Sequence, residues 1–204
     1  MTMATISTLR DASHDVEITE DRQEYSGFRS LNTTTYLDPT NGETASRETL
    51  KTWPAVAVIA YDPALDELVM IRQFRLAMQL ETGRGMAIEF VAGAIDDGET
   101  GEEAARREMM EEAGIEATMM QREFAYMPTP GITNEVITVF FAHVDATTVA
   151  DRGGLEEETE ETFPFRCKPD DVFARIGEEA FNNGITLTAL LWLERNRERL
   201  LTRT

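Results

Sequence analysis

The order of apolar and polar positions divides the chain into a short N-terminal stretch of strands and a longer mixed part. Residues 1–16 contain no sustained apolar run, which is typical of a disordered or weakly ordered terminus. Alternating segments within residues 17–53, such as 25–37, predict a small antiparallel β unit with a turn at 38–42. Residues 54–204 hold most of the long apolar segments, so we expect them to form the main domain.

The main part begins with two segments that fit a hairpin. The continuous apolar run at 54–63 predicts a buried strand, and 67–74 follows an Asp-Pro turn as its partner. Trp53 and Trp192 are expected to pack in the core. The other expected elements are a loop at 76–86, strands at 87–93, 115–127, 135–144 and 162–167, and helices near 169–180 and at 185–200.

One helix is marked at both ends by its own residues. Residues 100–114 have helical character, with Thr100 as a plausible N-cap and Glu103 three positions later, which together form a capping box. Gly114 fits the left-handed position that often follows a helix. We therefore expect a helix that starts and stops at defined residues.

Three carboxylates share one face of this helix, because Glu108, Glu111 and Glu112 stand at positions i, i+3 and i+4. Their mutual repulsion costs some tenths of a kcal/mol per pair, and a solvated acidic face is one interpretation. However, Arg107 precedes them, and Glu99 follows a loop bounded by glycines. Converging oxygen ligands suit Mg²⁺ or Mn²⁺, so a metal site is the competing hypothesis.

Composition narrows the possible chemistry. The 204 residues include 38 acidic and 19 basic ones, a formal net charge of −19, which disfavours binding to nucleic acid or to an anionic membrane. A divalent cation would still allow a phosphorylated small molecule to bind. Cys167 is the single cysteine, which excludes an intramolecular disulfide and a Cys-rich zinc site. With no signal peptide and no transmembrane run in the sequence, we expect a cytoplasmic protein.

The glycine-bounded loop and the acidic helix together resemble the Nudix box at every fixed position. This resemblance implies Mg²⁺-dependent hydrolysis, with Mn²⁺ as a possible substitute, of a nucleoside diphosphate linked to another group. It also implies an α+β fold with a mixed β-sheet in an α/β/α sandwich. The matching residues are Gly93, Glu99, Arg107, Glu108, Glu111, Glu112 and Gly114.

The resemblance assigns a role to each residue around the cation. Glu108 and Glu112 would bind metal, and Glu111 would bind a metal or a metal-bound water. The backbone carbonyl of Ala92 would be a further ligand. Arg107 would hold the carboxylates in position through charge-assisted hydrogen bonds.

A wider resemblance, over most of residues 17–200, is to the bacterial ADP-ribose pyrophosphatase branch of the family. Pro130 stands where that branch carries its usual marker for ADP-ribose, although a proline followed by Gly131 is also an ordinary turn signal. Glu135 would reach a ribose hydroxyl. Ile132 departs from the pattern, because relatives often have a second glycine there.

The acidic segment 154–161 matches a loop that supplies the catalytic base in this branch. By position, Glu158 would be the base and Glu160 a further metal ligand. Glu157 or Glu161 could take these roles, because the run of acids leaves the register open. The competing interpretation is a solvated acidic loop.

The N-terminal β unit resembles a segment that these enzymes exchange between the subunits of a homodimer. Phe28 and Arg47 match the aromatic and arginine that hold adenine, with a core phenylalanine and a surface arginine as the alternatives. Arg75 is the candidate for contacting the diphosphate, and Arg72 is the second choice.

The resulting prediction is a homodimeric hydrolase that cleaves ADP-ribose to AMP and ribose 5-phosphate. A hydrolase of another nucleotide sugar, such as GDP-mannose, is the alternative within the same class. A non-catalytic nucleotide-sensing Nudix domain is the alternative from another class, and the complete set of box carboxylates argues against it.

Overall fold

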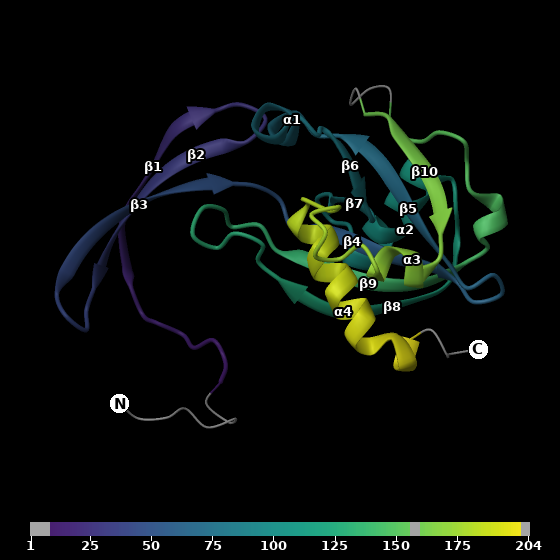
Figure 1. Ribbon diagram of the computed structural model, residues 1–204. Helices are drawn as coiled ribbons and strands as arrows, with labels where there is room; N and C mark the ends of the chain where they lie inside the picture. Colours follow the sequence, from purple (N-terminus) through teal and green to yellow (C-terminus); the bar gives the residue numbers. More distant parts are fainter. Residues whose placement is uncertain (1–8, 156–159, 201–204) are drawn as a thin grey trace. The chain divides into compact units, whose positions relative to one another are not determined.

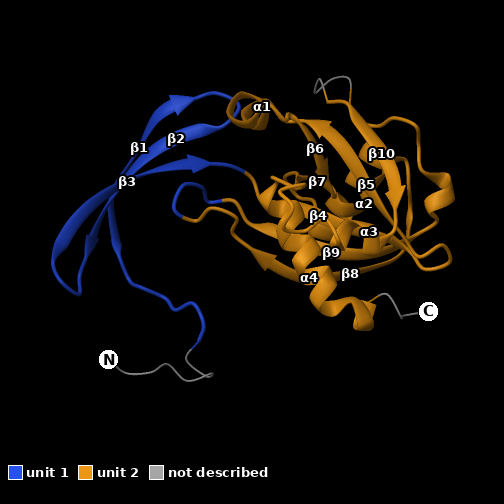
Figure 2. Ribbon diagram, viewed as in Figure 1, with its two compact units in different colours: residues 1–52, 131–134 blue, residues 53–130, 135–204 orange. Residues whose placement is uncertain are grey.

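The computed structural model describes residues 9–155 and 160–200 of the chain. Two compact units make up the chain (Figure 2). Unit 1 comprises residues 1–52 and 131–134, and unit 2 comprises residues 53–130 and 135–204. Residues 9–16 have no regular secondary structure.

Unit 1 contains a three-stranded antiparallel sheet, as predicted. Its strands follow the order β1 (Glu17–Ser26), β2 (Ser30–Asp38) and β3 (Glu43–Lys51). The continuous strand expected at 25–37 is wrong, because a turn separates β1 from β2 and pairs Ser26 with Ser30. Among the described residues of unit 1, none is buried.

Unit 2 is built around a mixed sheet of seven strands (Figure 1). Five of them follow the order β10-β5-β4-β9-β8, while β6 pairs with β5 and β7 with β4. Strands β4 and β9 are parallel, and the other pairs are antiparallel. The bounds are β4 Ala55–Asp62, β5 Glu67–Phe74, β6 Met86–Glu89, β7 Val91–Ala94, β8 Ala117–Tyr126, β9 Ile137–Val144 and β10 Thr162–Cys167.

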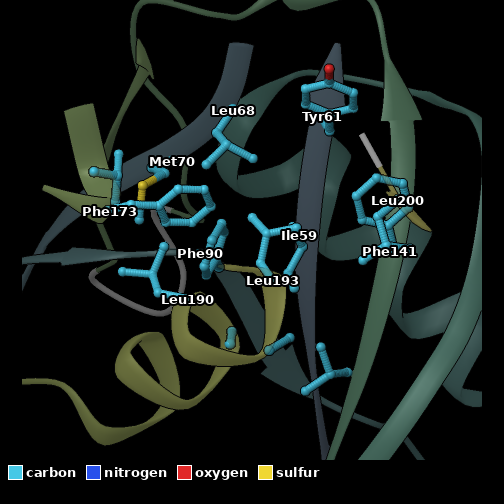
Figure 3. Packing of buried hydrophobic residues seen from close by; sticks show 14 of the residues in the cluster. Ile59, Tyr61, Leu68, Met70, Phe90, Phe141, Phe173, Leu190, Leu193 and Leu200 are labelled. Atoms are coloured by element: carbon cyan, nitrogen blue, oxygen red, sulfur yellow. The ribbon is translucent and has the colours of Figure 1, made fainter. Parts of the chain in front are cut away.

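Helices cover both faces of this sheet. Successive side chains of β4 point to opposite faces and belong to two separate buried clusters. On one face, Ile59 packs in a cluster with residues of α4 (Gly184–Leu200), including Leu190 and Leu193 (Figure 3). On the other face, Val58 packs in a cluster with residues of α2 (Gly101–Ala113), including Met109. The predicted α/β/α sandwich is confirmed.

Several local predictions are wrong. The expected loop at 76–86 begins with a helix, α1 (Leu76–Thr82), which has no buried residue, and its apolar pair Leu76 and Leu80 is exposed. The strand expected at 87–93 is split at buried Phe90, and the helix near 169–180 is only α3 (Pro169–Phe173). Trp53 is 44% exposed and does not lie in the core, whereas Trp192 packs partly buried against it.

Among residues 9–155 and 160–200, no helix is long and apolar enough to cross a membrane.

Candidate active site

The acidic helix has the boundaries that its end signals predict. Thr100 accepts a hydrogen bond from the backbone N–H of Glu103, and the Glu103 carboxylate accepts one from the Thr100 N–H at 2.8 Å. Gly114 then ends α2 in the left-handed conformation, at φ 65°. Both ends are set by neighbours in sequence, so the three carboxylates lie on the face that their spacing predicts.

Arg107 joins the box residues into one network. Its guanidinium forms a two-pronged ion pair with Glu99, at 3.0 and 2.9 Å, and donates to the backbone oxygen of Ala94. It also donates to Glu108 at 2.7 Å and to Glu111 at 3.0 Å. These hydrogen bonds, led by those to Glu99, raise the pKa of Arg107 and lower the pKa of Glu99. The arginine thus remains charged and restrains three carboxylates together.

Two of the carboxylates are buried and poorly compensated. Glu108 is 8% exposed and Glu112 is 1% exposed. Burial raises the pKa of Glu108 to about 7 in spite of Arg107, and raises the pKa of Glu112 well above its ordinary value. The Glu112 carboxylate accepts a hydrogen bond from the Ala92 N–H at 3.0 Å. Buried carboxylates in this state gain stability from a bound cation, because it offsets the cost of their charge.

The glycines of the box meet two different requirements. At Gly93 a side chain would overlap the carboxylate of Glu108, so the absence of a Cβ lets β7 approach α2 closely. At Gly114 the requirement is the positive φ that ends the helix.

The acidic segment 154–161 is hydrogen-bonded at its start to the last turn of α2. The Gly154 N–H donates to the Glu111 carbonyl at 2.7 Å, and the Thr162 hydroxyl donates to the Glu112 carbonyl at 2.6 Å. At Gly153 a Cβ would overlap the same Glu112 carbonyl. Residues at the start of the segment and directly after it therefore bind the carboxylate helix, a contact that the sequence did not predict.

The structure describes some, but not all, of the residues proposed as the catalytic base or the further metal ligand. Glu158 and Glu157 lie outside the described residues. Glu160 accepts a hydrogen bond from the side chain of Gln73 on β5. Glu161 pairs with Arg152 at 2.6 Å.

Arg75 lies immediately after β5 and forms an ion pair with buried Glu89, with a shortest distance of 2.7 Å. Sequence reasoning missed both Glu89 and Gln73. Glu89 is the single polar residue of the otherwise apolar strand β6, and that irregularity was the available signal, whereas Gln73 directly follows Arg72 and had no such signal. The second choice, Arg72, lies over the ring of Phe165, 5.0 Å from its centroid.

The other predicted substrate contacts are divided between the two units. Phe28 in unit 1 is 83% exposed, so the alternative of a core phenylalanine is wrong. Arg47 is exposed and donates to the backbone oxygen of Ser46. Gly131 also belongs to unit 1, whereas Pro130 and Glu135 belong to unit 2.

The donor set fits a hard divalent cation. Glu108, Glu111 and Glu112, with Glu160 and the Ala92 carbonyl, offer oxygen atoms of the kind that Mg²⁺ and Mn²⁺ prefer. Across the described ranges, no three His, Cys, Asp or Glu side chains already form a closed ligand cluster. Arg107 engages oxygens of Glu108 and Glu111, so a cation would compete for or share them. The ligand set thus remains a prediction.

Comparison with known proteins identifies the family. A family model described as NUDIX domain matches residues 51–187. The chain is 31% identical over 191 residues to the ADP-ribose pyrophosphatase of Escherichia coli K12, covering 92% of this chain and 91% of that protein. Identity to the ADP-ribose pyrophosphatase of Haemophilus influenzae is 31% over 196 residues, with coverages of 93% and 90%. The GDP-mannose pyrophosphatase of Cronobacter sakazakii is 33% identical over 152 residues, with coverages of 72% and 79%.

The chain therefore belongs to the Nudix family. Its resemblance to the bacterial ADP-ribose pyrophosphatases is confirmed, and so is the predicted class, a Nudix pyrophosphatase. A solved structure titled as an ADP compounds hydrolase superposes with a TM-score of 0.72 at 20% identity, covering 96% of this chain and 100% of the other. That likeness supports the fold.

Proposed function

We propose that this protein hydrolyses the diphosphate of ADP-ribose to AMP and ribose 5-phosphate. The observation that carries the proposal is the complete carboxylate set on α2, with Glu108 and Glu112 buried and Arg107 bonded to Glu99, Glu108 and Glu111. Pro130, and the names of the relatives that cover nine tenths of the chain, favour ADP-ribose among nucleotide sugars.

In the proposed mechanism the protein's own groups hold and orient the reactants. Glu108, Glu111, Glu112, Glu160 and the Ala92 carbonyl would hold Mg²⁺. When bound, Mg²⁺ neutralises the diphosphate and lowers the pKa of a coordinated water.

The remaining groups act on the water and on the substrate. Glu158 would take the proton from the attacking water as the general base. Water attacks one phosphorus in line, and the bridging P–O bond breaks. Arg75 would bind a diphosphate oxygen.

The substrate assignment is tested on a panel of nucleotide sugars at fixed Mg²⁺. We expect the highest kcat/KM for ADP-ribose, with AMP and ribose 5-phosphate as products, and complete loss of turnover in EDTA that excess Mg²⁺ restores. A preference for GDP-mannose would favour the alternative suggested by the Cronobacter relative. Binding without turnover of any compound would favour a sensing domain.

We also propose that the protein is a homodimer in which unit 1 is exchanged. A three-stranded sheet with no buried residue among those described does not stabilise itself in water. A second copy of the chain would cover it, and Phe28 and Arg47 would bind the adenine. Light scattering should give twice the 22.9 kDa chain mass; a monomer at micromolar concentration would refute the dimer.

We further propose a cytoplasmic protein that does not bind nucleic acid or membranes. The formal charge of −19 supports the absence of such partners, and the single free cysteine, Cys167, supports a reducing compartment.

A further inference from the structure

A buried carboxylate connects Arg75 to the beginning of α4. Glu89, on β6, is only 3% exposed. Its Oε1 accepts from Arg75 Nε at 3.0 Å, and its Oε2 accepts from Arg75 Nη2 at 2.7 Å. The Oε1 atom also accepts from the Asn183 amide at 2.7 Å. Both oxygens of the carboxylate are thus engaged, and its orientation depends on both neighbours.

Asn183 is held at both ends of its amide. Its Nδ2 donates to Glu89, while its Oδ1 accepts from the backbone N–H groups of Ile185 at 2.8 Å and Thr186 at 3.1 Å. The latter bonds cap the N-terminus of α4. Because one end contacts only an acceptor and the other only donors, the amide has a single favourable orientation. The N-terminus of α4 therefore fixes the orientation of the Asn183 amide that donates to Glu89.

Arg75 retains donor capacity beyond this ion pair. Its Nε and Nη2 are used by Glu89, and within the part of the chain that the structure describes Nη1 has no hydrogen-bond partner. Burial lowers the pKa of Arg75. The ion pair with Glu89 and the negative charges of Glu112 and Glu160 raise it by more, so the pKa of Arg75 lies above its ordinary value. The guanidinium thus lies within the field of the proposed metal ligands, with N–H groups available for a phosphate oxygen.

We propose that Asn183 is a positioning residue that acts through Glu89 to hold Arg75 in the orientation that binds the substrate diphosphate. The inference rests on the proposed function, because it takes Arg75 to contact the diphosphate. Without the Asn183 donor, Glu89 can rotate, and the half-exposed Arg75 side chain follows it. A misdirected guanidinium then loses part of its hydrogen bonding to the diphosphate.

The test separates the two bonds of Asn183. In Asn183→Ser the shorter side chain still caps α4 but cannot reach Glu89. Asn183→Ala removes both contacts. Asn182→Ser, at the exposed neighbouring position, is the matched control. We expect Asn183→Ser to raise KM for ADP-ribose roughly tenfold with a smaller change in kcat, at a melting temperature close to that of the wild type. Asn182→Ser should match the wild type, and an unchanged KM in Asn183→Ser would overturn the proposal.

A double-mutant cycle with Arg75→Ala shows whether Asn183 acts through the arginine. If it does, adding Asn183→Ser to Arg75→Ala changes KM by less than twofold. An equal KM increase in both backgrounds would mean that Asn183 acts by another route, and would refute the proposal.

The same measurements distinguish the two hypotheses. Turnover of ADP-ribose by the wild type tests the proposed function, whereas the ratio of KM values tests the role of Asn183. If the wild type prefers another nucleotide sugar, the cycle is measured on that compound, and only the substrate assignment fails. If the wild type cleaves no nucleoside diphosphate compound, both proposals fail.

Discussion

Units 1 and 2 differ in how they use their apolar residues. In unit 2, the sheet separates two buried clusters, and the carboxylate helix is attached to one of them through residues such as Met109. In unit 1, Ile18, Tyr25 and Phe28 are all more than half exposed, and none of the described residues is buried. The carboxylates of the proposed metal site thus stand where packing is dense, which suits the fixed geometry that catalysis requires. Unit 1 carries the residues proposed to bind the adenine of the substrate.

The largest effect is expected from removing one buried carboxylate in unit 2. Glu112→Gln should lower kcat by roughly 10³-fold, because a ligand charge at the proposed metal site is lost. Its melting temperature in EDTA should not fall, since a poorly compensated buried charge disappears. Steady-state kinetics and thermal unfolding measure both effects. Glu102→Gln, on the exposed side of the same helix, is the control; near-normal turnover in Glu112→Gln would refute its role.

Paired apolar truncations test the difference in packing. Leu193→Ala in unit 2 should lower the free energy of unfolding by about 2–5 kcal/mol, because the fully buried side chain leaves a cavity. Ile18→Ala in unit 1 should cost less than about 0.5 kcal/mol in a monomer. Denaturant titrations at several protein concentrations measure both. Because we propose that a second chain covers unit 1, we expect a larger loss for Ile18→Ala that depends on protein concentration; a small loss at every concentration would contradict the dimer.

Truncation of the exposed aromatic tests the binding role of unit 1. Phe28→Ala should raise KM for ADP-ribose roughly tenfold with little change in kcat, because a base stacked on an aromatic ring gains about 1–3 kcal/mol. Leu76→Ala, an exposed apolar residue of unit 2, is the control. An unchanged KM for Phe28→Ala would place adenine elsewhere.

The smallest effect concerns alkaline stability. Tyr61 is buried in unit 2, donates to Asp66 at 3.0 Å, and has its pKa raised by burial to about 12 from an unfolded value of 10. Between these values the folded state retains a proton that the unfolded state loses, so stability is present below pH 10 and falls as the pH rises.

Tyr61→Phe should therefore remove part of this slope in unfolding titrations between pH 10 and 12. Tyr25→Phe, which changes an exposed tyrosine of unit 1, should keep it. Equal slopes in the wild type and Tyr61→Phe would contradict the assignment.

Prediction from sequence succeeded where neighbours in the chain decide the structure. The capping box at Thr100, the end of α2 at Gly114 and the spacing of the glutamates depend on contacts within a few residues. The same local rules failed for α1, which buries no residue, and for the strand broken at Phe90.

The sequence by itself determined the box, its helix and the family, because spacing along one helix places carboxylates on one face. Only the tertiary structure decided which carboxylates are buried, and that Glu89 accepts hydrogen bonds from both Arg75 and Asn183. Those contacts join residues far apart in the chain, and burial depends on how sheet and helices pack. The periodicity of the sequence therefore predicts neither the contacts between distant residues nor the burial of a particular carboxylate.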